Sequence, residues 1–175
     1  IGISCASLMF MLPLSIHSAT TIHVGHRAGA GRWRDARRAG WTGIGICVAI
    51  MCCSCVVLLV SRRAIAALYT SDSAVLALAA QLLLYAGFFQ VADGLQVGAA
   101  GALRGFKDAR VPMVLNVFSY WAIGFPLAWY FGVHAGYGAP AVWLGLIAGL
   151  FVCAILLTLR YGVISQRALQ LERPI

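Results

Sequence analysis

Residues 75–103 read VLALAAQLLLYAGFFQVADGLQVGAAGAL and contain one charged residue, Asp93. A helix needs about 20 mainly apolar residues to cross a bilayer, so this run is long enough to span one. An ionised carboxylate is costly at that depth and normally faces a protein or water interior. Because residues three and four apart share a helical face, we expect Gln90 and Gln96 to flank Asp93, together with Phe89. Asp93 is therefore the first candidate for a functional site.

The composition places the chain in a membrane. Hydrophobic residues make up 62% of it and charged residues only 10%, whereas an ordinary soluble domain is about 25% charged. The apolar runs are continuous and do not alternate every second residue, which predicts helices rather than the strands of a barrel. We therefore predict an all-α, polytopic membrane helix bundle. Its five predicted spans are approximately residues 1–25, 40–60, 75–103, 111–131 and 139–159.

The basic residues fall on alternating connections between these spans. Of the 13 Lys and Arg residues, eleven lie in the first connection, the third connection and the C-terminal tail, and only Arg62 and Arg63 lie in the second. Loops rich in Lys and Arg stay in the cytoplasm, so we predict that these three regions are cytoplasmic. Topology then explains the net charge of +8, with contact to anionic lipid as an additional role. Nucleic acid is not an expected partner, because the arginines are split among short connections without a recognisable binding motif.

The start of the chain carries no targeting signal. Residue one is Ile1, and neither the charged start nor the cleavage pattern of a signal peptide follows it. An apolar segment that begins in this way predicts a piece of a longer polytopic protein. We therefore expect folding and function to need further helices upstream.

The cysteines and histidines do not form a recognisable metal-ligand pattern. The run CCSC, residues 52–55, lies inside a predicted span and lacks the separated pairs typical of zinc sites. We therefore predict buried apolar thiols and no disulfide framework. His17 and His23 are expected to line a cavity or a helix end, and His17 could titrate near neutral pH if it faces water. These residues predict no cofactor and no metal or haem site.

An intramembrane enzyme is an alternative from a different functional class. It would need a paired nucleophile and base, or a second intramembrane acid beside Asp93. The predicted spans contain no second acid, and the chain has no GxSxG motif. We therefore favour a transporter over an enzyme.

Small residues and prolines predict how the helices pack. Pro13 and Pro126 lie within spans, where each removes a backbone donor and is expected to bend its helix. Glycines four residues apart let helix backbones approach closely in lipid. Such pairs occur at Gly94/Gly98, Gly101/Gly105 and Gly145/Gly149.

Several segments resemble one family of transporters. AGFFQVADGLQ at 86–96, followed by GALRGFKD at 101–108, resembles the tenth helix and the following loop of the multidrug and toxin extrusion (MATE) transporters, NorM branch. The resemblance also covers the eighth helix and its loop, the loop before the tenth helix, and the eleventh helix. The residues that carry it are PLSI at 13–16, Val24, Gly25, GAG at 29–31, LYT at 68–70, SYW at 119–121, Gly124 and Pro126.

The resemblance implies a fold and a domain arrangement. Residues 1–161 would form a partial C-terminal transmembrane lobe, helices eight to twelve of a twelve-helix antiporter, and residues 162–175 a cytoplasmic tail. Such an antiporter exports cationic or amphipathic compounds against inward flow of sodium or protons, without a cofactor. The partners implied are membrane lipid, small cationic or amphipathic substrates, and the missing N-terminal helices of the same protein. The location implied is a bacterial-type inner membrane.

The resemblance also assigns a role to Asp93, which matches the acid of the tenth helix that contributes to cation coupling and would hold any bound sodium. Phe89 stands where an aromatic hydroxyl can occur in related proteins, and His17 and His23 stand where Gly and Arg are common. A lipid-linked precursor flippase of the same superfamily would share the fold, but its cavity should be strongly basic, and no Arg or Lys lies mid-span here. The residues expected to line the substrate cavity are Phe89, Gln90, Gln96, Ser4, Ser7, His17 and Tyr120.

Overall fold

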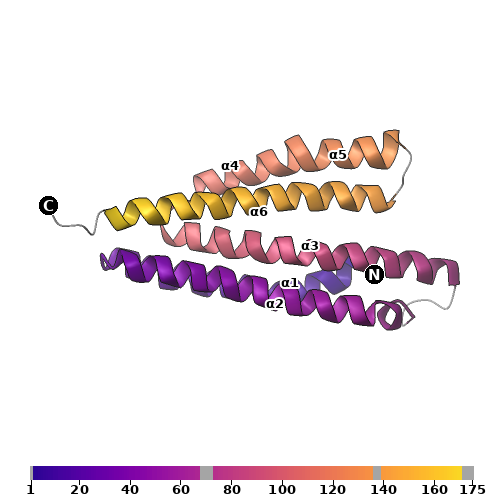
Figure 1. Cartoon of the computed structure of the whole chain (residues 1–175), viewed down its shortest axis with the longest axis horizontal. Coiled ribbons are helices and arrows are strands. Elements are labelled where there is room, and N and C mark those ends of the chain that lie inside the picture. Colours follow the sequence, from indigo (N-terminus) through magenta and orange to yellow (C-terminus); the bar gives the residue numbers. More distant parts are fainter. Residues whose placement is uncertain (1, 68–72, 136–138, 171–175) are drawn as a thin grey trace.

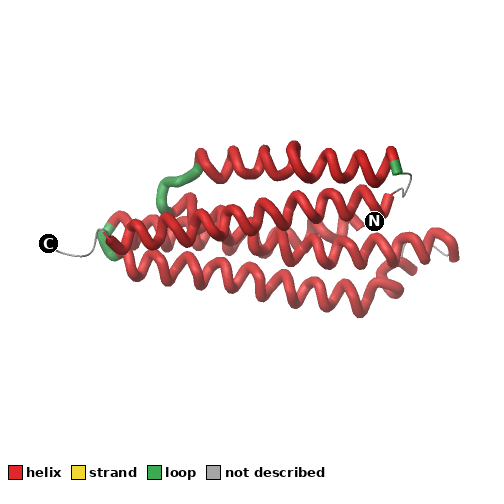
Figure 2. The backbone as a smooth tube through the Cα atoms, turned by 45° about the horizontal axis from the view of Figure 1, so that its top comes forward, coloured by secondary structure: helices red, strands yellow, loops and turns green. Residues whose placement is uncertain are grey.

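The structure of the chain is a computed structural model. It describes the backbone of residues 2–67, 73–135 and 139–170, and the side chains from residue 11 onward except those at 63, 66–67, 73–78, 80 and 139. Figure 2 shows helices joined by short connections throughout this part. The elements are α1 (Gly2–Gly29), α2 (Trp33–Ala67), α3 (Ser73–Gly105), α4 (Arg110–Phe118), the π-helical η1 (Ser119–Gly124), α5 (Phe125–Trp129), the π-helical η2 (Tyr130–His134) and α6 (Ala139–Gln170).

The predicted all-α membrane bundle is confirmed. Within the described residues, four segments are long and apolar enough to cross a membrane: Trp33–Arg62, Gln81–Gly105, Arg110–His134 and Pro140–Gln170. Each contains most of one predicted span. The 28 residues of α1 rise about 42 Å, which exceeds the thickness of a bilayer core, but the side chains of its residues 2–10 lie outside the described part. The first of the five predicted spans therefore stays a prediction.

The outer faces of the helices are apolar. On α2, Val56, Val57 and Val60 have 59%, 52% and 80% of their surface exposed. Soluble monomers rarely expose apolar patches that continue in this way, whereas lipid tails solvate them. The chain is therefore an integral membrane protein.

The helices run beside one another, with α3 in the centre. Figure 1 shows α1 and α2 along one side of α3, and α6 with the α4–α5 segment along the other. The end of α1, the end of α3 and the end of α6 all lie toward the left of this view. The three basic regions of the sequence thus share one end of the bundle, as the distribution of arginines requires.

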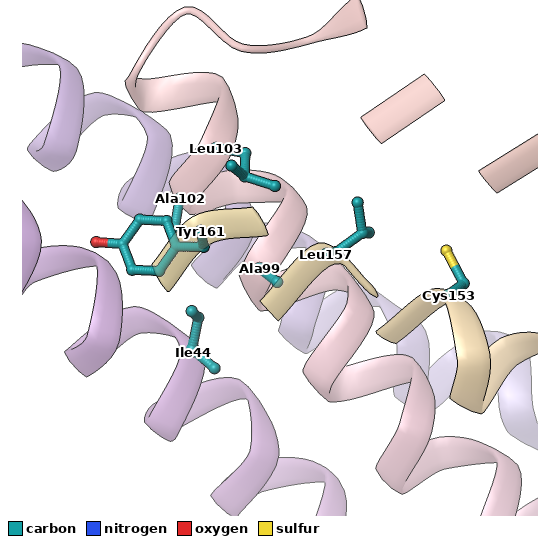
Figure 3. Close-up of a cluster of buried hydrophobic side chains, with 7 residues drawn as sticks. All are labelled: Ile44, Ala99, Ala102, Leu103, Cys153, Leu157 and Tyr161. Atoms are coloured by element: carbon teal, nitrogen blue, oxygen red, sulfur yellow. The ribbon is translucent and has the colours of Figure 1, made fainter. Parts of the chain in front are cut away.

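A buried cluster joins α3 to α2 and α6 near the end of the bundle that the three basic regions share. Figure 3 shows its members, which are Ile44, Ala99, Ala102, Leu103, Cys153, Leu157 and Tyr161. The fully buried Tyr161 hydroxyl donates a hydrogen bond to the Arg37 carbonyl oxygen of α2, at 3.0 Å. Gly40 leaves the space for this ring, since an added Cβ would collide with the tyrosine oxygen. Small residues of α2 and α3 therefore let a large aromatic of α6 fill the core.

All three predicted glycine pairs lie at close helix contacts. A Cβ added at Gly98 would lie 2.9 Å from the Ile44 Cα of α2, and one at Gly101 would lie 2.8 Å from the His17 carbonyl oxygen of α1. On α6, a Cβ at Gly149 would lie 2.8 Å from the Gly124 Cα. A real Cβ cannot be placed at such distances without moving a backbone. These glycines therefore set the spacing of the helices.

The helix that contains Pro126, which was expected to bend there, is irregular in its hydrogen-bonded turns. Two π-helical turns, η1 and η2, lie on either side of the short α5, which begins at Phe125. A proline has no N–H and its ring clashes with the carbonyl four residues earlier. Wider turns accommodate both defects. By contrast, α1 continues as α-helix through Pro13.

At the chain end, α6 does not stop at the predicted boundary after residue 161. It continues to Gln170, and Ser165 and Ala168 on this extension are buried. These two residues lie three apart and so share a face that packs inward. The predicted tail therefore begins as a continuation of the last helix.

The expectation of buried cysteines was partly wrong. Cys47, Cys55 and Cys153 are buried, whereas Cys52 and Cys53 are exposed on α2. Neighbouring helix residues point about 100° apart, so one run of cysteines cannot lie wholly on the packed face. The side chain of Cys5 lies outside the described residues.

Candidate functional site

Asp93 lies at the midpoint of the apolar segment Gln81–Gly105 and is half-buried. Within the described residues, no hydrogen bond or ion pair joins its carboxylate. It lies within electrostatic range of the Cys47 thiol on α2 and the Tyr120 hydroxyl on η1. A carboxylate at this depth without a partner is a functional-site candidate.

Asp108, another acid of the same chain, has a structural role and provides a comparison with Asp93. Its Oδ2 accepts a hydrogen bond from the Nε of Arg160 at 3.0 Å, and this ion pair ties the α3–α4 connection to α6. Asp108 lies at the end of the bundle, whereas Asp93 lies in mid-span. The two carboxylates therefore differ in both depth and partner.

Gln90 lies one helical turn before Asp93 and is only 2% exposed. Both its amide nitrogen and its amide oxygen are buried, and neither has a hydrogen-bond partner among the described residues. Leaving a buried polar group unpaired costs about 1–3 kcal/mol. The amide is thus free to bind a polar group that reaches it.

Gln96, one turn after Asp93, has hydrogen-bond partners on α4 and η1. Its Nε2 donates to Asn116 Oδ1 of α4 at 2.6 Å, and its Oε1 accepts from the Tyr120 hydroxyl at 3.2 Å. Asn116 Oδ1 also accepts from the Cys153 thiol of α6 at 2.7 Å. This polar network joins α3 to α4, η1 and α6 beside the acid.

The sequence prediction included Gln96 and Tyr120 but missed Asn116 and Cys153. Asn116 is the only asparagine of the chain and lies within an apolar span, where polar side chains commonly hydrogen-bond across helices. A single asparagine within an apolar span could therefore have been recognised as a candidate site residue from the sequence. Nothing in the sequence separates Cys153 from the other cysteines, because its role depends on the position of α6.

Phe89 lies on the side of α3 that faces α6. Its ring meets the Trp143 ring edge to face, with centroids 6.2 Å apart and planes at 84°. The residues that the sequence placed on one face of α3 around Asp93 therefore cover a broad part of the helix surface, because they contact different neighbouring helices. Asp93 lies at its centre, with Phe89 and Gln96 toward α6 and α4.

His17 joins α1 to the part of α3 that follows Asp93 in the chain. Its Nδ1 lies 2.8 Å from the Val97 carbonyl oxygen, and its Nε2 lies 3.3 Å from an Arg104 guanidinium nitrogen. The neutral ring satisfies both contacts if Nδ1–H donates and Nε2 accepts. Thr21 strengthens the same joint by donating to the Gly101 carbonyl oxygen at 3.0 Å. His17 thus connects the two helices about one to three turns beyond Asp93.

The remaining predicted residues lie apart from Asp93 or cannot be placed. His23 is exposed and lines a cavity between α1 and α2. The side chains of Ser4 and Ser7 lie outside the described residues. The structure therefore groups Phe89, Gln90, Gln96 and Tyr120 around Asp93, with His17 on the adjoining joint.

Comparison with known proteins places this arrangement in a family. The MatE family profile matches residues 1–130, which includes α3 and the whole Asp93 region. The chain belongs to the MatE family. Its helical bundle superimposes on a MatE structure described as the inward-facing conformation of a multidrug resistance MATE family transporter of the MOP superfamily, with a TM-score of 0.86 at 19% identity. The alignment covers 97% of this chain and 39% of that one, and shows a shared fold.

Curated MatE relatives are more similar in sequence. The chain is 47% identical over 167 residues to a "Probable multidrug resistance protein NorM" of Xanthomonas campestris, and 41% identical over 171 residues to "Multidrug resistance protein PmpM" of Pseudomonas aeruginosa. Each alignment covers 95% of this chain and 36% of the relative. These are names of multidrug resistance proteins rather than of enzymes. The chain spans little more than a third of their length.

Proposed function

We propose that this chain is part of the C-terminal lobe of a multidrug efflux antiporter, which exports cationic or amphipathic compounds in exchange for sodium or protons. The observation that carries the proposal is Asp93, a mid-span carboxylate without a partner among the described residues. Membership of the MatE family and similarity to multidrug resistance proteins support it. The protein acts in a bacterial inner membrane, with the C-terminus in the cytoplasm.

The chemistry of such coupling follows from competition for one charge. The Asp93 carboxylate accepts a proton or attracts sodium, and either event neutralises a charge held in a low-dielectric surrounding. A cationic substrate competes for the same carboxylate, so the ion and the substrate are bound in turn. Two lobes that rock around a central site then carry them in opposite directions.

The neighbours of Asp93 support this role. The unpaired Gln90 amide offers a donor and an acceptor one turn away, while Phe89 and Trp143 supply aromatic surface to an amphipathic compound. The network of Gln96, Asn116 and Tyr120 fixes the other side of the site. A site with one charge, few polar groups and aromatic walls suits cations of varied shape.

The proposal predicts that the parent protein extrudes drugs whereas this chain alone does not, because the cavity lies between two lobes. Vesicles that contain the purified parent should expel a cationic dye when a sodium or proton gradient is imposed. Vesicles with the isolated chain should show only leakage. Dye extrusion by the isolated chain, at the rate of the parent, would refute the two-lobe proposal.

The orientation can be tested by cysteine labelling in the parent protein, with the other accessible cysteines replaced. Ala135 and Gln166 are both exposed. Ala135 follows η2, before α6 begins, and Gln166 lies near the other end of α6, and Figure 1 shows the two ends of α6 at opposite ends of the bundle. A membrane-impermeant maleimide should label Ala135→Cys in intact cells, and should label Gln166→Cys only after permeabilisation. The reverse pattern would invert the proposed topology.

A further inference from the structure

The cavity that His23 lines lies between α1 and α2, on the far side of α1 from the joint with α3. Its volume is about 720 Å³. One end is strongly basic and is lined by Arg27, Arg32, Arg38 and His23, with Asp35 as an acidic member. The other end is lined by apolar side chains, including Ile16 and Ile46. The cavity is therefore amphipathic along its length.

The basic end carries charge that the chain does not neutralise. Among the described residues, the guanidinium groups of Arg27, Arg32 and Arg38 have no hydrogen-bond or ion-pair partner. Asp35 lines the same cavity, but no arginine lies within ion-pair distance of its carboxylate in the described part of the chain. Three guanidinium groups beside one carboxylate leave a net positive charge. Guanidinium groups bind phosphate oxygens through paired hydrogen bonds.

The dimensions match the boundary between lipid headgroups and acyl chains. Ile16 and Arg27 are separated by about 16 Å of helix rise, so the cavity extends from the helix ends into the hydrocarbon region. Ile46, which lines the cavity, is 43% exposed, and Ile22 on α1 is 68% exposed, so both helices that form the cavity carry exposed apolar side chains. Trp41, one turn after the basic residues of α2, is 40% exposed. Tryptophans prefer the membrane interface.

We propose that this cavity binds one anionic phospholipid. Its phosphate lies against Arg27, Arg32 and Arg38, and its acyl chains follow the apolar end past Ala19 and Ile46. Anionic lipid is favoured over free phosphate because the cavity continues from charged to apolar surface. Basic pockets between transmembrane helices are recognised sites for acidic headgroups.

The test uses the full-length parent protein purified in a mild detergent. Binding of phosphatidylglycerol, phosphatidylcholine and inorganic phosphate is measured by native mass spectrometry and by thermal stability. We expect phosphatidylglycerol to bind and to raise the midpoint of thermal unfolding, and phosphatidylcholine and inorganic phosphate to do neither. Inorganic phosphate that displaces phosphatidylglycerol at equal concentration would overturn the lipid assignment in favour of a phosphate site.

A pair of charge variants locates the site. Each basic residue near anionic lipid contributes about fivefold to affinity, so Arg32→Gln with Arg38→Gln should weaken phosphatidylglycerol binding about thirtyfold. The matched control is Arg110→Gln with Arg167→Gln, which removes two exposed arginines, one at the start of α4 and one in the last turn of α6, neither of which lines the cavity. An equal loss in both double variants would show unspecific attraction to charge and would overturn the proposal.

A third variant tests the cavity without changing the charge. Ala19→Trp places a large ring at the apolar end and should reduce phosphatidylglycerol binding to the level of phosphatidylcholine. Ala19 is exposed, so its replacement disturbs no core contact, and the elution volume and unfolding midpoint without lipid check the fold. Unchanged phosphatidylglycerol binding in a folded Ala19→Trp protein would exclude this cavity as the lipid site.

Discussion

Asp93→Asn in the parent protein is expected to abolish ion-driven efflux while leaving the amount of protein in the membrane unchanged. The amide keeps the shape of the carboxylate but cannot hold a charge. Interactions with a charged group are worth up to about 3 kcal/mol, which corresponds to roughly a 100-fold loss of rate. Removing an unpaired, half-buried charge relieves a desolvation cost, so stability should hold or rise slightly. Dye efflux measured beside membrane abundance checks both parts.

The matched control is Asp108→Asn, which removes the same charge from the paired carboxylate at the end of the bundle. The Arg160 partner is partly exposed, so we expect a cost of only about 0–1 kcal/mol in stability and near-normal efflux. Normal efflux with normal abundance in Asp93→Asn would exclude Asp93 as the coupling residue. Imposing a sodium or a proton gradient separately on the wild-type protein identifies the ion.

Gly145→Ala is expected to destabilise the bundle, although alanine favours helices more than glycine. An added Cβ at Gly145 would lie 2.6 Å from the Ala128 Cα of α5, and only a shift of backbone can relieve that contact. Overpacking of this kind costs about 1–3 kcal/mol. We expect a lower unfolding midpoint and less folded protein after extraction from the membrane.

Gly162→Ala on the same helix provides the comparison. Nothing lies within 4 Å of a Cβ added there, so helix propensity alone should act and stability should rise by up to about 1 kcal/mol. Opposite signs for the two alanines would establish that close backbone contact, rather than helix propensity, decides the effect. Equal midpoints for both variants would contradict the close packing of α5 on α6.

Periodicity and spacing predicted the features that depend on a single helix. The spans, the mid-span position of Asp93 and the glycine pairs suited to close helix contact could be derived because apolar runs, isolated charges and four-residue spacings act locally. The amide of Gln90 beside Asp93 follows from the same helical geometry.

Features that depend on how two helices meet could not be derived. The contacts of His17 with Val97 and Arg104 require the register of α1 against α3, which no local pattern encodes. The same holds for the thiol of Cys153 on Asn116. The exposure of Cys52 and Cys53 was missed because composition indicates that a helix lies in the membrane, but not which of its faces packs against protein.

The positions of the close glycine contacts divide the bundle into two groups. Gly94, Gly98 and Gly101 hold α3 against α1 and α2, while Gly145 and Gly149 hold α6 against η1 and α5. Among the described glycines, none brings α3 against α6 in this way, and these helices meet through side chains instead. Side chains can change rotamer and slide, whereas backbones in direct contact resist displacement. The boundary between α3 and α6 therefore depends on side-chain packing rather than on direct backbone contact, and the mid-span carboxylate lies next to it.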